Sequence, residues 1–145
     1  MPEDEEKLDE TQAVERLNAA LGLQYRSALQ YSLVAASLTG IEAQAIGSKL
    51  TQFGDAELAD VRLLVEKVVS FGGEPTTQVA ELRHYGEADA ALRWLVECEE
   101  AAVEALQEAI EPTGRDGRSE ALEHLMEHLI LRKQHQVDFL SRAVS

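Results

Sequence analysis

The stretch GGEPTTQVAELRHYGE, residues 72–87, decides the fold, because it divides the chain into two pairs of helical segments. Its glycines and Pro75 end the helix before it. On both sides lie long segments rich in Ala, Leu, Glu and Gln, which favour helices. We expect helices over residues 11–38, 42–71 and 88–111, and a fourth that Ser119 caps and that runs to residue 143.

The lengths of the connections predict the topology. The breaks at Thr39–Gly40, where glycine suits a helix C-cap, and at residues 112–117 are short, so the helices that they join are antiparallel neighbours. A helix of about 28 residues is about 42 Å long, and about 13 extended residues span that distance. Residues 72–87 can therefore cross the whole bundle. The sequence predicts an all-α, antiparallel four-helix bundle (11–145) with one long crossover between helices two and three, after an acidic tail (1–10).

Each expected helix carries an apolar stripe that a polar residue interrupts near its midpoint. Helices packed in register would bring these polar residues to one level, and a buried charge is costly unless it is paired, hydrogen-bonded or metal-bound. The stripes therefore predict a functional site or its remnant. We call these residues the polar belt: Gln24, Glu57, Asp60, Glu99, Lys133 and Gln136.

Four segments carry a family resemblance. They are LNAALGLQYRSALQY (17–31), ELADVRLLVEKVVSFGGEP (57–75), ECEEAAVEALQEAI (97–110) and QVDFL (136–140). In these segments, and in their order between Leu17 and Leu140, the chain resembles a bacterioferritin-type member of the ferritin-like superfamily. The expected bundle is then the ferritin-like one.

The resemblance also implies a place for two irons, held in that family by a Glu from each of two helices and an E-x-x-H from each of the other two. The two single Glu positions fall on Gln24 and Glu99. The two E-x-x-H pairs fall on Glu57 with Asp60, and on Lys133 with Gln136. Tyr31 matches a tyrosine near the iron site of relatives. Leu58 stands where haem-binding relatives carry Met, so haem is not expected.

The charges of the belt leave three alternatives open. Glu57, Asp60, Glu99 and Lys133 sum to two negative charges. We expect a metal-free network in which Lys133 bridges carboxylates, with no cofactor and no catalytic residue. In the second alternative, iron or another divalent metal binds to Glu57, Asp60 and Glu99, and Lys133 is displaced. A working di-iron ferroxidase is the third.

These alternatives correspond to different functions. The metal-free network predicts a structural or interaction module with a degraded ferroxidase site. A metal-bound belt predicts an iron-binding or iron-storage protein. A third hypothesis is a subunit that co-assembles with active ferritin-like chains.

Several residues outside the belt allow a functional role. His124 and His128 lie four apart on one helix face, a spacing that can hold a surface metal. For these two residues and His135 we expect partly exposed positions or a dimer contact in preference to a metal site. Tyr25 and Trp94 lie off the apolar stripes, so we expect them to pack on a partner subunit.

Composition limits the partners and the compartment. The net charge of −14 disfavours binding to nucleic acid and to anionic membranes. No apolar run approaches the roughly 20 residues that cross a bilayer. The single Cys98 cannot form an intramolecular disulfide, so we expect a structural thiol in a cytoplasmic protein. A homodimer is the expected assembly.

Overall fold

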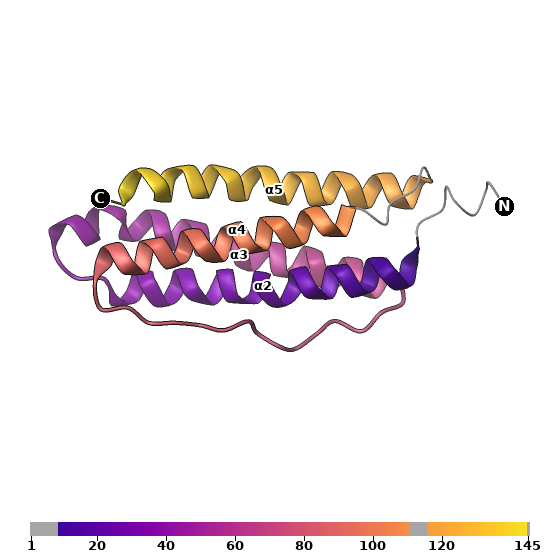
Figure 1. Cartoon of the computed structure of the whole chain (residues 1–145), viewed down its shortest axis with the longest axis horizontal. Helices are drawn as coiled ribbons and strands as arrows, with labels where there is room; N and C mark the ends of the chain where they lie inside the picture. The colour runs from indigo at the N-terminus through magenta and orange to yellow at the C-terminus, as the bar shows by residue number, and fades with distance from the viewer. Residues whose placement is uncertain (1–8, 111–115, 145) are drawn as a thin grey trace.

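The computed structural model describes residues 9–110 and 116–144, apart from the side chain of Glu42. Its helices are α2 (Glu10–Ser37), α3 (Ile41–Ser70), α4 (Ala88–Ile110) and α5 (Gly117–Ala143). They form one bundle in which α2 is antiparallel to α3 and α4 is antiparallel to α5 (Figure 1). Residues 71–87, the crossover, run along the outside of the bundle from one end to the other. The predicted all-α bundle with a single long crossover is confirmed.

The boundaries of α2, α3 and α4 lie within one residue of those expected, and α5 begins three residues before its expected start. Two capping assignments were wrong. The N-cap of α5 is Asp116, whose carboxylate accepts a hydrogen bond from the backbone nitrogen of Ser119 at 2.8 Å. Ser119 lies inside the helix. Gly40 is the N-cap of α3, with φ at +92°, and Leu38 is the C-cap of α2. Residues 1–8 of the expected acidic tail (1–10) lie outside the described residues. The last two residues of that range belong to α2, with Asp9 as its N-cap and Glu10 as its first residue.

Gly72 turns the chain out of α3 and into the crossover. Its φ of +79° is accessible to glycine at little cost. The Gly72 nitrogen donates to the Val69 carbonyl at 2.9 Å, and the Gly73 nitrogen donates to the Val68 carbonyl at 3.0 Å. This pair of bonds is the Schellman motif, and it ends α3 with its last carbonyls satisfied.

Two amide side chains of α2 hold the crossover against the bundle. Asn18 donates to the Glu74 carbonyl at 2.9 Å and accepts from the Thr76 nitrogen at 2.8 Å. Gln30 donates to the Arg83 carbonyl at 2.6 Å and accepts from the Arg83 nitrogen at 3.1 Å. Each amide therefore satisfies one backbone donor and one backbone acceptor in a segment that has no helix or strand of its own.

The crossover also covers the two aromatic residues that were expected to meet a partner subunit. Tyr25 donates its hydroxyl to the Thr76 carbonyl at 2.8 Å. Trp94 is only 7% exposed and lies beside Tyr85, with ring centroids 6.4 Å apart. That expectation was wrong for Trp94, because the crossover buries a face of α4 that lies outside the apolar stripe.

The bundle core has two apolar clusters, one towards each end. One is built around Leu17, Leu64 and Leu122, and the other around Leu50, Leu95 and Leu140. Within residues 9–110 and 116–144, none of the helices is long and apolar enough to cross a membrane.

Candidate functional site

The polar belt lies between the two apolar clusters, and the structure buries it completely. The exposed fraction is 0% for Lys133 and Glu99, 1% for Gln24, Glu57 and Asp60, and 2% for Gln136. The predicted burial of all six residues is therefore confirmed. Five of them, together with Tyr31, form one set of contacts that we call the Lys133 network: Gln24, Tyr31, Glu57, Glu99, Lys133 and Gln136.

Lys133 of α5 lies between the two carboxylates of the network. Its Nζ is 2.6 Å from Glu57 Oε2 of α3 and 3.1 Å from Glu99 Oε1 of α4. Both contacts are charge-assisted hydrogen bonds, and these are stronger than neutral ones. The ammonium thus stands between the carboxylates of two helices and joins them to a third.

The two glutamines complete the network with amide donors. Gln136 Nε2 is 2.6 Å from Glu57 Oε1 and 2.7 Å from Glu99 Oε2, so that it can donate one N–H to each carboxylate. Gln24 donates to the Glu57 side chain and, at 2.8 Å, to the Glu57 carbonyl. Both Glu57 oxygens therefore receive hydrogen bonds, as a buried carboxylate requires.

Burial and mutual charge set the protonation of the network. Burial opposes ionisation of Glu57, but the charge of Lys133 and the hydrogen bonds from Glu99, Lys133 and Gln136 together outweigh burial, and the pKa of Glu57 is lowered. Burial likewise opposes the charge on Lys133, yet Glu99 and Glu57 raise its pKa above the ordinary value. Burial raises the pKa of Glu99 to about 7, and Glu57 adds to the shift while Lys133 limits it. At neutral pH the network holds a Glu57–Lys133 ion pair beside a partly protonated Glu99.

Tyr31 and Cys98 stay in their neutral forms. Burial, followed by the charges of Glu99 and Glu57, raises the pKa of the Tyr31 hydroxyl well above its usual value. That hydroxyl lies 3.3 Å from Gln136 Nε2. Burial raises the pKa of the Cys98 thiol to about 11. A protonated thiol is a poor nucleophile, so this position suits the structural role expected for it.

Asp60 lies apart from the Lys133 network. Its buried carboxylate forms an ion pair with Arg132 of α5, whose side chain is 31% exposed. Asp60 was expected to lie with Glu57 and Glu99, and Arg132 was not expected to contact it. The sequence gives only a weak signal for the Asp60–Arg132 ion pair, because Arg132 lies off the apolar stripe and one sequence does not show which cation faces a buried Asp.

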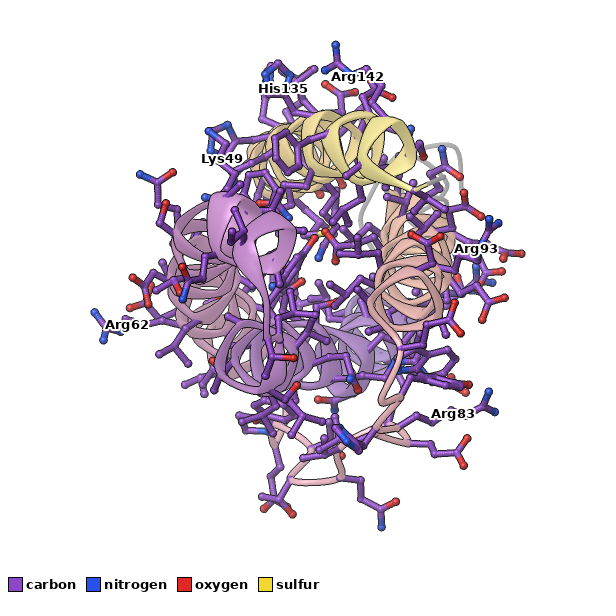
Figure 2. All side chains as sticks on the ribbon, turned by 90° about the vertical axis from the view of Figure 1, so that its left-hand side faces the viewer. Lys49, Arg62, Arg83, Arg93, His135 and Arg142 are labelled. Carbon is purple, nitrogen blue, oxygen red and sulfur yellow. The ribbon has the colours of Figure 1, made fainter. Side chains whose placement is uncertain are left out.

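The residues present do not fit a two-iron centre. Such a centre takes four carboxylates and two imidazoles, whereas the Lys133 network offers Glu57 and Glu99 with an ammonium between them. In the part of the chain that the structure describes, no three His, Cys, Asp or Glu side chains gather where they could hold a metal ion. His124, His128 and His135 are exposed on α5, and Figure 2 shows His135 on the outer side of that helix.

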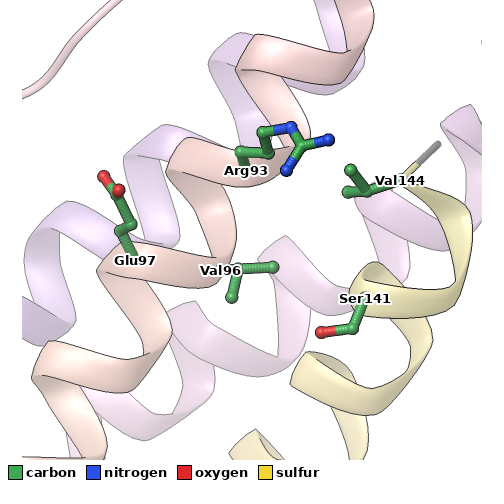
Figure 3. A pocket seen from close by; sticks show the side chains of 5 residues that line it. All are labelled: Arg93, Val96, Glu97, Ser141 and Val144. Carbon is green, nitrogen blue, oxygen red and sulfur yellow. The ribbon is translucent and has the colours of Figure 1, made fainter.

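The surface pockets lie away from the network. One of about 430 Å³ opens between α4 and α5 and is lined by Arg93, Val96, Glu97, Ser141 and Val144. Figure 3 shows Arg93 reaching towards Val144 while Glu97 points away. No residue of the Lys133 network lines this pocket.

Two solved structures with the same fold are bacterial proteins. One is described as a ferritin-like diiron-carboxylate protein from Bacillus anthracis str. Ames, with a TM-score of 0.84, 21% identity, and coverage of 94% of this chain and 98% of that one. Another is described as a dodecameric thioferritin, the bacterioferritin-related protein from Bacteroides fragilis, with a TM-score of 0.84, 18% identity, and coverage of 94% and 86%. No curated protein sequence matches the chain.

A family model, described as the ferritin-like domain, matches residues 14–145. That range includes all four helices almost completely. The chain therefore belongs to the ferritin-like domain family.

Proposed function

We propose that this chain is a ferritin-like protein in which the Lys133 network replaces a ferroxidase centre, so that it serves as a non-catalytic structural or interaction module. One observation carries the proposal. Lys133 Nζ lies 2.6 Å and 3.1 Å from Glu57 and Glu99, the two glutamates that the family resemblance assigns to iron. An ammonium between them supplies the positive charge that a metal would otherwise bring.

The alternative is an iron-binding or iron-storage protein with an altered metal site. It requires Lys133 to leave Glu57 and Glu99, and Asp60 to leave Arg132 before it can act as a third ligand. Removing one partner from a buried ion pair costs about 3–5 kcal/mol. A metal would have to offset that cost, so this alternative predicts weak binding.

Metal content and Fe(II) oxidation separate the two functions. We expect the purified, untagged protein to carry no stoichiometric iron and to oxidise Fe(II) no faster than the surface-matched variant Lys49→Glu/Gln134→His. The double substitution Lys133→Glu/Gln136→His restores two of the family's ligands, and we expect it to bind iron and to gain oxidation activity. Two equivalents of iron with rapid oxidation in the native protein would show that the site is functional.

We also propose that the chain forms a homodimer through α2 and α3. Leu29 and Leu58 are 49% and 62% exposed, and Leu33 lies one turn from Leu29 on α2 with 37% exposure. Contacts of Gln24 with Glu57, and of α2 with Gly54, place Leu29 and Leu58 about one helical turn apart along the bundle. Exposed leucines on adjacent helices are typical of association surfaces. Co-assembly with active ferritin-like chains, and a dodecamer like that of the Bacteroides fragilis protein, are the alternatives.

A further inference from the structure

Trp94, the single tryptophan of the chain, is contacted by two arginines that come from other parts of the fold. The guanidinium carbon of Arg26, on α2, lies 5.2 Å from the indole centroid, and that of Arg83, in the crossover, lies 4.3 Å from it. A guanidinium over an indole ring is a favourable contact. Three segments of the chain thus place two positive charges on one ring of α4.

Arg26 is buried without a counter-charge. It is 9% exposed, and its Nε has no hydrogen-bond partner. None of the ion pairs found among residues 9–110 and 116–144 includes Arg26. A cation–π contact contributes about 0.5–1 kcal/mol at an exposed site and about 2 kcal/mol when it is desolvated, whereas removing a charge from water costs several kcal/mol. Stacking on Trp94 alone therefore leaves the buried Nε edge of the guanidinium undercompensated.

A second donor beside Arg26 also has no acceptor. Trp94 is 7% exposed, and its indole Nε1 is buried without a hydrogen-bond partner in the described chain. Arginine and the indole nitrogen only donate hydrogen bonds. The nearby Cys98 supplies no negative charge, because burial raises the pKa of its thiol to about 11. Arg83 is already paired with Glu81, so the uncompensated charge is that of Arg26. A negatively charged oxygen would compensate this charge and would accept from the two unpaired donors.

Arg83 gives this cluster an access route from the surface. Its side chain is 45% exposed and bonds to Glu81 and Tyr85, its neighbours in the crossover. Figure 2 shows Arg83 on the outside of the molecule. A rotation of this side chain would uncover Trp94 and leave Gln30 still bound to the Arg83 backbone.

We propose that Arg26, Arg83 and Trp94 form a binding site for a small oxyanion, a carboxylate or a phosphate group. Arg26 supplies the buried charge, Trp94 Nε1 supplies a second donor, and Arg83 closes over the anion from the crossover. A bidentate guanidinium suits both kinds of group. The net charge of −14 repels anions in general, so binding depends on these local donors. The site does not depend on the absence or presence of iron in the Lys133 network.

Trp94 is itself the reporter for the test, because the chain contains no other tryptophan. Inorganic phosphate and citrate are titrated separately at an ionic strength held constant with sodium chloride, and indole fluorescence is followed. We expect a saturable change with at least one of them, and the responding anion identifies the phosphate or the carboxylate source. Arg26→Gln should weaken binding at least tenfold and Arg83→Gln by a smaller factor. The matched control Arg62→Gln changes an exposed arginine of α3, far from Arg83 in Figure 2, and should bind as the native protein does.

Thermal unfolding provides a measurement that does not depend on fluorescence. An anion that binds the folded state raises its Tm, so the responding anion should raise the Tm of the native protein and of Arg62→Gln but leave that of Arg26→Met unchanged. The proposal is wrong if neither anion gives a saturable response up to about 10 mM, a concentration that already corresponds to very weak affinity. An equal response of native protein and Arg26→Gln would also overturn it.

Discussion

Lys133 is the residue on which the interior of this protein depends most. A lysine with no exposed surface is tolerated because Glu57 and Glu99 both bond to its ammonium. Such a pair is expensive to desolvate and far more expensive to leave half complete. The network is therefore best understood as a set of charges that must be present together.

Removal of Lys133 alone should be strongly destabilising. In Lys133→Met, Glu57 becomes a buried carboxylate without a cation, so the free energy of unfolding should fall by about 3–5 kcal/mol. Lys133→Met/Glu57→Gln removes both members of the ion pair and should recover most of this loss. Urea unfolding at neutral pH measures both values. Equal loss in the single and double variants would mean that side-chain shape matters at this position and charge pairing does not.

Glu99 should make the stability depend on pH. Its pKa is about 7 in the folded protein and 4.5 ordinarily. Between these values the unfolded chain has released the proton while the folded protein still holds it, so the contribution of Glu99 to stability is lost as the pH rises through this window. The pKa of Glu57 is shifted in the opposite direction. The stability that Glu57 contributes is therefore lost only as the pH falls below the ordinary pKa of this carboxyl.

The pH test compares the native protein with Glu99→Gln, which cannot titrate. The native protein should lose stability relative to this variant as the pH rises from about 5 to about 8, by an amount on the order of 1–3 kcal/mol. Unfolding free energies at several pH values give the difference. Glu104→Gln, an exposed change on the same helix, should show no such slope. A flat difference for Glu99→Gln would show that this carboxyl titrates normally.

At the scale of the elements, the helices were easy to predict and their connections were harder. Glycine and proline at positions 72–75 marked the end of α3, and its boundary lies one residue from the expected one. Capping depends on which side chain meets which backbone nitrogen, and two competing residues, Asp116 and Ser119, lie only three apart. The sequence alone does not decide such a choice.

The crossover should be loosened by the loss of one α2 amide. Gln30→Ala leaves the Arg83 nitrogen and carbonyl without their partners and should cost about 1–3 kcal/mol. The effect should be local, with faster amide hydrogen exchange around residues 80–85 and little change in the cores of the helices. The matched control is Gln44→Ala on the exposed side of α3, where exchange should stay as in the native protein. Uniform acceleration along the chain would instead indicate global destabilisation.

At the scale of the whole molecule, the polar belt was predicted from its height in the bundle, and that was enough to identify most of the network. The exception is instructive. Asp60 lies nearly one helical turn beyond Glu57 on α3, yet its carboxylate pairs with Arg132 and not with Lys133. The place of a residue in an apolar stripe predicts how deeply its side chain is buried. The partner that the side chain contacts depends on the neighbouring helix, which a single sequence does not show.

The proposed dimer gives a prediction at this scale. Leu58→Lys places a charge on the α3 face that we propose as the interface, so it should shift the protein towards monomer in size-exclusion chromatography with light scattering. Leu131→Lys makes the same change at a 71% exposed residue of α5 and should leave the assembly intact. If both variants keep the native mass, the interface lies elsewhere, and a native mass of several dimers would favour a larger cage.

The crossover has a further consequence for how the molecule could be divided. It separates two helical hairpins, α2 with α3 and α4 with α5, and it adds no helix to the interior (Figure 1). The first hairpin carries Gln24, Tyr31 and Glu57, while the second carries Glu99, Lys133 and Gln136. A single proteolytic cut near the exposed Val79 and Leu82 would leave two complementary fragments, each holding one half of a charge-balanced interior. The two halves would recognise each other through Glu57 of the first hairpin and through Lys133 and Gln136 of the second.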